Sequence, residues 1–134
     1  MPITTTWYDD DHRAVYQKFE GQWTWDDFAR ELTALNDFSS SVPYNLVVFE
    51  DLSQANTIPG GNGIAQGRMI MKLIPNTVTV VFVIQSRFQE AMVATVINLF
   101  PNWRNRVKFA KTLDEGQALV ARLVAQNAEQ STVT

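Results

Sequence analysis

One stretch of the sequence constrains the fold more than any other. It is a run of strand-forming residues, 46–49, that stops at two acids, Glu50 and Asp51. The glycine-rich segment 58–63 follows, and a helical pattern begins at Ile64. A strand that leads through such a loop to a helix N-terminus is where open α/β sheets usually place their binding surface. We therefore predict an α/β fold whose working surface includes this loop.

The composition indicates one compact domain. The chain has 134 residues, of which 46% are hydrophobic, and this is enough for a single core. Its net charge of -3 argues against a nucleic-acid partner, which requires a concentrated basic surface. No apolar run approaches the length of a membrane span, and residues 1–4 lack the pattern of a signal peptide. We therefore expect a cytoplasmic protein with no stable membrane insertion.

Residue periodicity and capping motifs predict the element order ββαβαβαβα. Strands that alternate with helices after a first hairpin imply a mostly parallel mixed sheet of about five strands with about four helices. We place this single domain at residues 1–126 and a flexible C-terminal tail at 127–134. The predicted strands are 3–7, 14–20, 44–49, 78–84 and 107–110, and the predicted helices begin near Thr24, Ile64, Ser86 and Leu113.

The predicted order and a short motif together resemble the STAS domain. This fold occurs in bacterial anti-sigma-factor antagonists and in the cytoplasmic tails of sulfate transporters. The matching residues are Asp51, Leu52, Ser53 and Ile58 around the loop, and the last helix start at 112–119. The resemblance covers almost the whole chain and implies a regulatory domain that binds other proteins.

The sequence departs from the family at the residue that carries the switch. In the antagonists, a partner kinase phosphorylates a serine in an Asp-Ser-Ser-Gly segment, and the added charge switches binding. The corresponding residues here are 59–62, Pro-Gly-Gly-Asn, which contain no hydroxyl. Ser53 and Thr57 carry nearby hydroxyls at other positions of the motif. The resemblance therefore implies the architecture of a divergent STAS-like domain without its phosphorylation switch.

Two functions remain open on these observations. The first is a non-enzymatic regulatory or scaffolding protein that binds a protein partner, or a second copy of itself, through the loop and the following helix. The alternative is a carrier or sensor of a nucleotide, a lipid or another anion, with the backbone N–H groups of the glycine-rich loop as the anion site. CRAL-TRIO lipid carriers have a related sheet arrangement, which is an analogy at the level of the fold alone. The candidate binding residues for both are Asp51, Ser53, Thr57, Gly60, Gly61, Asn62, Gly63 and Arg68.

Each candidate has a plainer interpretation. The glycines can form a connector with positive φ angles, and Arg68 can be a solvated surface residue. For the carrier, Met69, Met71 and Met92 could line an adaptable apolar pocket, although methionine is equally ordinary core filler.

Catalytic and metal chemistry find little support in the sequence. Glu50 and Asp51 are adjacent, so on a strand they would point to opposite faces rather than to one substrate. The only histidine, His12, lies beside the acids 9–11 in a predicted turn, without the spacing of a metal loop. No cofactor motif or Gly-x-Ser-x-Gly elbow is present. We expect no enzyme, no cofactor and no metal.

A second surface is suggested by aromatic residues near the end of the third helix. Phe100 and Trp103 lie beside Arg104 and Arg106, a combination that suits a binding hot spot. The alternative is that these aromatics fold back onto the core. Unprotected edge strands would also make a dimer plausible.

Overall fold

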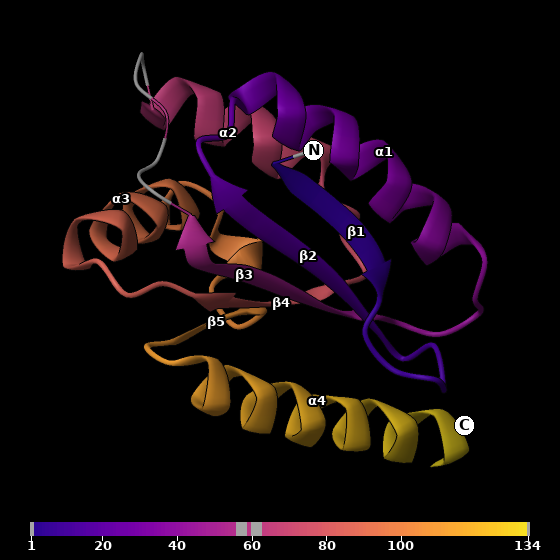
Figure 1. Cartoon of the computed structure of the whole chain (residues 1–134). Coiled ribbons are helices and arrows are strands. Elements are labelled where there is room, and N and C mark those ends of the chain that lie inside the picture. The colour runs from indigo at the N-terminus through magenta and orange to yellow at the C-terminus, as the bar shows by residue number, and fades with distance from the viewer. Residues whose placement is uncertain (1, 56–58, 60–62, 134) are drawn as a thin grey trace.

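The computed structural model describes residues 2–55, 59 and 63–133, and places a mixed sheet between two helical layers (Figure 1). The predicted element order ββαβαβαβα is confirmed, with one added 3-10 turn, η1. The elements are β1 (Ile3–Trp7), β2 (Ala14–Gly21), α1 (Trp25–Ser40), β3 (Val47–Ala55), α2 (Gly63–Leu73), β4 (Thr79–Val83), α3 (Arg87–Asn98), η1 (Pro101–Trp103), β5 (Val107–Ala110) and α4 (Leu113–Val133).

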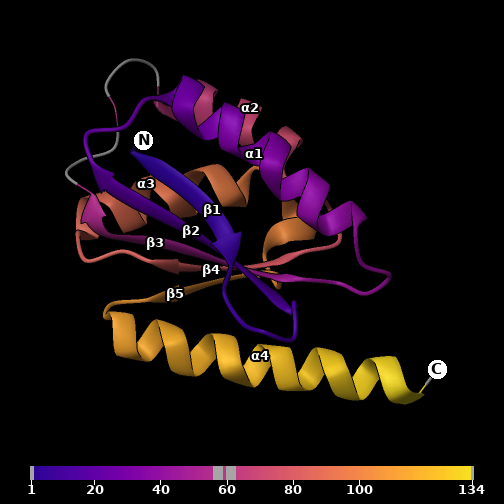
Figure 2. The ribbon, with the colours of Figure 1, turned by 45° about the vertical axis from the view of Figure 1, so that its right-hand side comes forward.

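The sheet has the strand order β1-β2-β3-β4-β5. β1 is antiparallel to β2, and the other neighbours are parallel. Each crossover from β2 onward moves one strand in the same direction, and right-handed crossovers of this kind place their helices on one face. α1, α2 and α3 accordingly cover one face, and α4 alone lies on the other (Figures 1 and 2).

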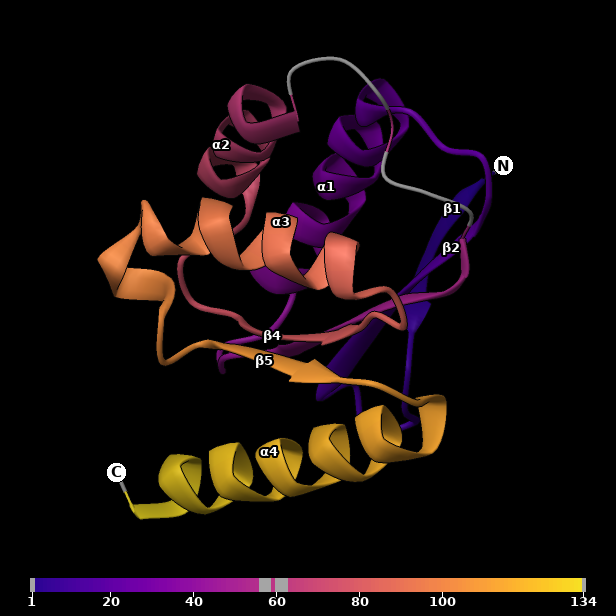
Figure 3. The ribbon, with the colours of Figure 1, turned by 90° about the vertical axis from the view of Figure 1, so that its left-hand side faces the viewer.

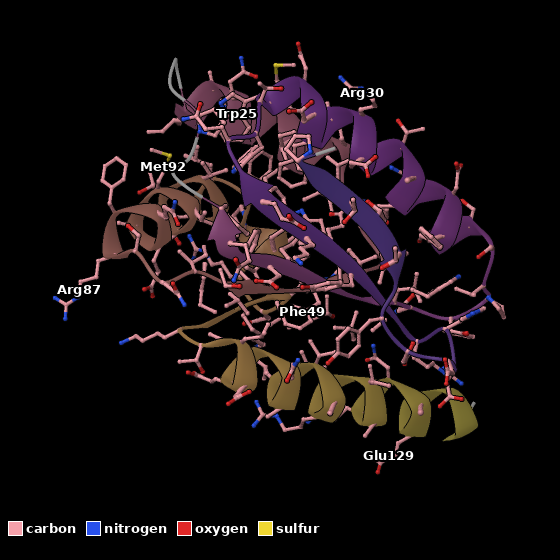
Figure 4. The ribbon with its side chains drawn as sticks, viewed as in Figure 1. Trp25, Arg30, Phe49, Arg87, Met92 and Glu129 are labelled. Atoms are coloured by element: carbon pink, nitrogen blue, oxygen red, sulfur yellow. The ribbon has the colours of Figure 1, made fainter. Side chains whose placement is uncertain are left out.

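Each face of the sheet has its own apolar core because side chains alternate along a strand. In β3, Val48 and Leu52 belong to the larger core under α1, α2 and α3. Val47 and Phe49 belong to the smaller core under α4, and Phe49 is labelled in Figure 4. Successive β3 side chains therefore enter the two helical layers in turn.

Two elements extend beyond their predicted ends. β3 continues through Glu50 and Asp51 to Ala55, because its pairing with β2 is maintained as far as Gly21 opposite Ala55. α4 continues to Val133, past the end predicted at Ala125, so the segment expected to be a flexible tail is helical to that residue. Residues 126–133 contain no glycine or proline to end the helix.

The predicted buried face of α3 was right at its centre and wrong at its two ends. The spacing of Phe88, Met92, Val96 and Leu99 predicts one buried stripe. Val96 is buried and Met92 half-buried, but Phe88 and Leu99 are 70% and 50% exposed. A close contact between α2 and α3 sets the actual register, since a Cβ atom on Gly67 would lie 2.7 Å from Val96 Cγ2. The buried α3 residues are Gln89, Val96 and Ile97.

Candidate functional site

The predicted site surrounds the carboxyl end of β3 and the start of α2. Thr57, Gly60, Gly61 and Asn62, and with them the proposed anion-binding backbone, lie outside the described residues. Gly63 is the first residue of α2. A Cβ atom there would lie 3.1 Å from Met92 Sδ, so the glycine allows α2 to approach α3 closely (Figure 3).

Asp51 is held by a buried hydrogen-bond cluster on the α4 side of the sheet. It is 2% exposed, and its Oδ2 accepts a hydrogen bond from the Tyr16 hydroxyl. Its Oδ1 accepts from the Ser53 backbone N–H at 2.9 Å and from Ser53 Oγ at 2.6 Å. The structure thus brings two predicted site residues together, in an arrangement that satisfies both from within the chain.

The third member of the cluster, Tyr16, was missed by the sequence analysis. Burial raises the pKa of its phenol, and the hydrogen bond to Asp51 raises it further. Tyr16 therefore remains a protonated donor at neutral pH. The only signal in the sequence was the alternation along the second strand, which places Tyr16 on the face that Val15 does not occupy. This alternation does not reveal a partner that is distant in sequence.

Glu50 points to the other face of the sheet and is 3% exposed. It lies between Gln17 of β2 and Phe82 of β4. Its Oε2 has no hydrogen-bond partner among the described residues. Burial raises the pKa of this carboxyl well above its ordinary value, so the neutral acid is the favoured form in the fold. Since Glu50 and Asp51 face opposite layers, they do not converge on one substrate.

A small apolar cavity of about 60 Å³ lies between α1, α2 and α3. Trp25 and Met92, both labelled in Figure 4, contribute to its wall together with Met71 and Phe82. Met69, the third methionine of the predicted pocket, is on the outer surface instead. Pockets for drug-sized ligands are typically ~300–1,000 Å³, so this cavity is far below the size of a lipid or nucleotide site.

The outer face of α2 combines exposed apolar and basic side chains. Met69 is 60% exposed, and Ile64 and Leu73 are each 45% exposed. Met69 and Leu73 are one helical turn apart and form one column, and Arg68 and Lys72 form the neighbouring column. Both basic residues are exposed, and α2 contains no acidic residue.

The aromatic residues after α3 are positioned as core residues. Trp103 is buried and belongs to the larger core, and Phe100 is half-buried against it. The Arg106 guanidinium lies over the Trp103 ring at 4.7 Å and donates a hydrogen bond to the Val78 carbonyl at 2.8 Å. Burial lowers the pKa of Arg106. The alternative in which these aromatics fold back onto the core agrees with this arrangement.

The acidic turn before β2 is arranged by hydrogen bonds within the turn. Asp9 Oδ1 accepts from the Arg13 and Ala14 backbone N–H groups at 2.9 and 3.2 Å. His12 stacks on Trp7 with ring centroids 4.2 Å apart. In residues 2–55, 59 and 63–133, no group of three or more His, Asp or Glu side chains could hold a metal ion.

Within the same described ranges, no helix has both the length and the apolar character needed to cross a bilayer. Comparisons with protein families, with curated proteins and with solved structures give no match for this chain.

Proposed function

We propose that this chain is a cytoplasmic, non-enzymatic regulatory or scaffolding protein that binds a protein partner through the outer face of α2. The observation that carries the proposal is the column of Met69 and Leu73 exposed to solvent beside Arg68 and Lys72. Exposed apolar side chains bordered by charged ones are typical of protein interaction sites. The element order agrees with the STAS resemblance that motivated this function, and the family relationship stays a prediction.

The partner surface should be apolar with an acidic border. Met69 and Leu73 would enter the desolvated centre of the interface, where apolar anchors contribute most of the affinity. Arg68 and Lys72 would lie at the rim, where opposite charges mainly set the association rate and the orientation.

The arrangement of the acids supports a role without catalysis. The Asp51 carboxyl oxygens are already occupied by Tyr16 and Ser53, and Glu50 is buried on the opposite face. Neither group reaches the exposed surface of α2, where the proposed partner binds.

Affinity purification of the full chain from its native cells tests the proposal. The wild-type chain should recover a stoichiometric protein, and Met69→Glu should lose it because a charge would enter the centre of the interface. Leu99→Glu is the matched control, since Leu99 is also exposed but lies after α3, and it should retain the partner. A wild-type chain that stays alone at micromolar concentration, or Met69→Glu that retains the partner, would contradict the proposal.

The carrier alternative has one observation in its favour, the apolar cavity whose wall includes Trp25. At about 60 Å³ this cavity would accept only a molecule much smaller than a lipid or a nucleotide. The Trp25 indole Nε1 is buried without a hydrogen-bond partner among the described residues. Native mass spectrometry of freshly purified protein distinguishes the two functions. A reproducible small-molecule adduct would favour the carrier, and a bare mass in repeated preparations would remove its support.

A further inference from the structure

The outer edge of β5 presents backbone groups that are not part of the sheet ladder. β5 is the last strand of the sheet, and its inner edge pairs with β4. Val80 N–H donates to the Arg106 carbonyl at 2.7 Å, and Ile84 N–H donates to the Ala110 carbonyl at 3.0 Å. Because backbone groups alternate in direction along a strand, those of Val107 and Phe109 point to the outer edge. This edge can accept a further strand.

A groove runs along the seam between this edge and α4. One hollow, of about 520 Å³, is lined by Lys108 of β5 and by Arg122 and Gln126 of α4. A second, of about 370 Å³, is lined by Phe109 and again by Arg122. Figure 3 shows α4 running beside β5 along this side of the molecule. The two hollows thus share a residue and follow one edge strand.

The edge is basic in a chain that is acidic overall. Residues 104–111 contain Arg104, Arg106, Lys108 and Lys111 and no acid, while the whole chain has a net charge of -3. Lys108 and Arg122 form no salt bridge with a described residue. The salt bridges between described residues join Lys18 to Glu20 and Arg30 to Asp27. Glu115 is the one acid that lines the second hollow. The groove therefore carries an excess of positive charge.

We propose that the groove between β5 and α4 binds an extended acidic peptide segment of a partner protein, which adds to the sheet as a strand beside β5. Backbone hydrogen bonds to Val107 and Phe109 would supply affinity, and the two hollows would receive side chains of the peptide. Lys108 and Arg122 would select for acidic residues. This surface lies on the α4 side of the sheet, away from α2, so it stands independently of the function proposed above.

The charge pattern favours this occupant over a second copy of the chain. Two β5 strands paired edge to edge would bring the same basic side chains against one another, and like charges in such pairs are destabilising. Basic residues on an edge are also a common protection against self-pairing. Basic residues alone would only protect the edge. The two hollows beside it add space for the side chains of a bound peptide.

Amide chemical-shift mapping of the full-length, isotope-labelled chain tests the proposal. The probes are peptides of about eight residues, a usual strand length, with glutamate alternating with valine, threonine or phenylalanine. Such peptides should shift the Val107 and Phe109 amides. Three controls should leave these two amides unshifted. They are the same peptides N-methylated at alternate residues, the same peptides with lysine in place of glutamate, and inorganic phosphate. The double variant Lys108→Gln, Arg122→Gln should weaken peptide binding about fivefold, and Arg87→Gln, an exposed change on α3 (Figure 4), should leave it unchanged.

Several outcomes overturn the proposal. No shift at Val107 or Phe109 with any acidic peptide would exclude an acidic strand at this edge. Equal binding of the N-methylated peptides, or the same shifts with phosphate, would show an anion site without strand addition. Shifts of these amides with protein concentration alone would show that a second copy of the chain occupies the edge.

Discussion

Glu50 occupies a β3 position whose neighbours on the same face, Val48 and Leu52, are buried apolar residues. Its Oε2 has no partner among the described residues, so it can remain in the core only as a neutral acid. Asp51, one residue further on, is buried equally deeply but accepts hydrogen bonds from Tyr16 and Ser53. Two adjacent carboxyl groups thus differ in their hydrogen-bond partners because alternate side chains enter different layers.

The first residue-scale prediction concerns the pH dependence of stability. Burial raises the folded-state pKa of Glu50 above its unfolded value, so above the ordinary glutamate pKa the folded chain holds a proton that the unfolded chain releases. The contribution of Glu50 to the free energy of unfolding is therefore fully present at low pH. It falls as the pH rises toward the folded-state pKa, by up to about 1.4 kcal/mol per pH unit. Urea unfolding at several pH values should show this loss in the wild type and its removal in Glu50→Gln. If the free energy of unfolding changed with pH in the same way in the wild type and in Glu50→Gln, the prediction would be wrong.

The second residue-scale prediction concerns the Tyr16 hydroxyl. Tyr16→Phe keeps the ring that packs on Phe49 but leaves a buried acceptor of Asp51 without its donor. We expect a loss of about 2 kcal/mol in the free energy of unfolding, measured by denaturant titration. Tyr8→Phe is the matched control in the same aromatic cluster, since no hydrogen bond joins the Tyr8 hydroxyl to the described residues. Equal effects of the two substitutions would show that the cluster does not depend on the Tyr16–Asp51 bond.

Among the helices, α4 packs closely on the sheet at Gly116. A Cβ atom there would lie 2.4 Å from Val83 Cγ2 and 3.2 Å from Phe49 Cε1. Both atoms belong to the smaller core, which α4 covers (Figure 2). Packing of α4 on this face therefore depends on one residue without a side chain.

Gly116→Ala should destabilise the protein even though alanine is the better helix former. The alanine methyl cannot be placed without moving α4 or the side chains beneath it. Such overpacking costs about 1 to 3 kcal/mol, and a contact as short as 2.4 Å places the cost at the upper end, above the gain of about 1 kcal/mol in helix propensity. Thermal or urea unfolding measures the effect. Gln117→Ala, an exposed neighbour on α4, should be neutral or slightly stabilising; a similar result for Gly116→Ala would show that the helix adjusts freely.

Local signals predicted some elements and missed others for identifiable reasons. The capping box at Thr24 and Asp27 is formed as predicted, and the apolar stripe of α1 buries Phe28, Leu32 and Leu35. These features depend on residues that are near in sequence. The length of β3 and the register of α3 depend instead on distant contacts, namely the pairing of β3 with β2 as far as Gly21 and the contact of Gly67 with Val96.

At the scale of the whole molecule, the element order already specified the α/β class, because strands alternating with helices require parallel pairing. The candidate site was less predictable. Asp51 and Ser53 were expected at a binding surface, but the fold buries Asp51 and joins it to Ser53. The use of α2 as a binding surface stays a prediction, whereas the basic groove at β5 required knowing which strand forms the sheet edge.

The position of α4 after the last strand of the sheet has a consequence for synthesis. The sheet and its three crossover helices are complete in sequence by Ala110, but Val47, Phe49 and Val81 are covered only once α4 has packed. A chain emerging from the ribosome would therefore display an uncovered apolar sheet face after β5 has emerged and until α4 has emerged and packed. We expect chaperone association with this domain to be strongest at that stage, after the sheet has formed and before α4 covers it.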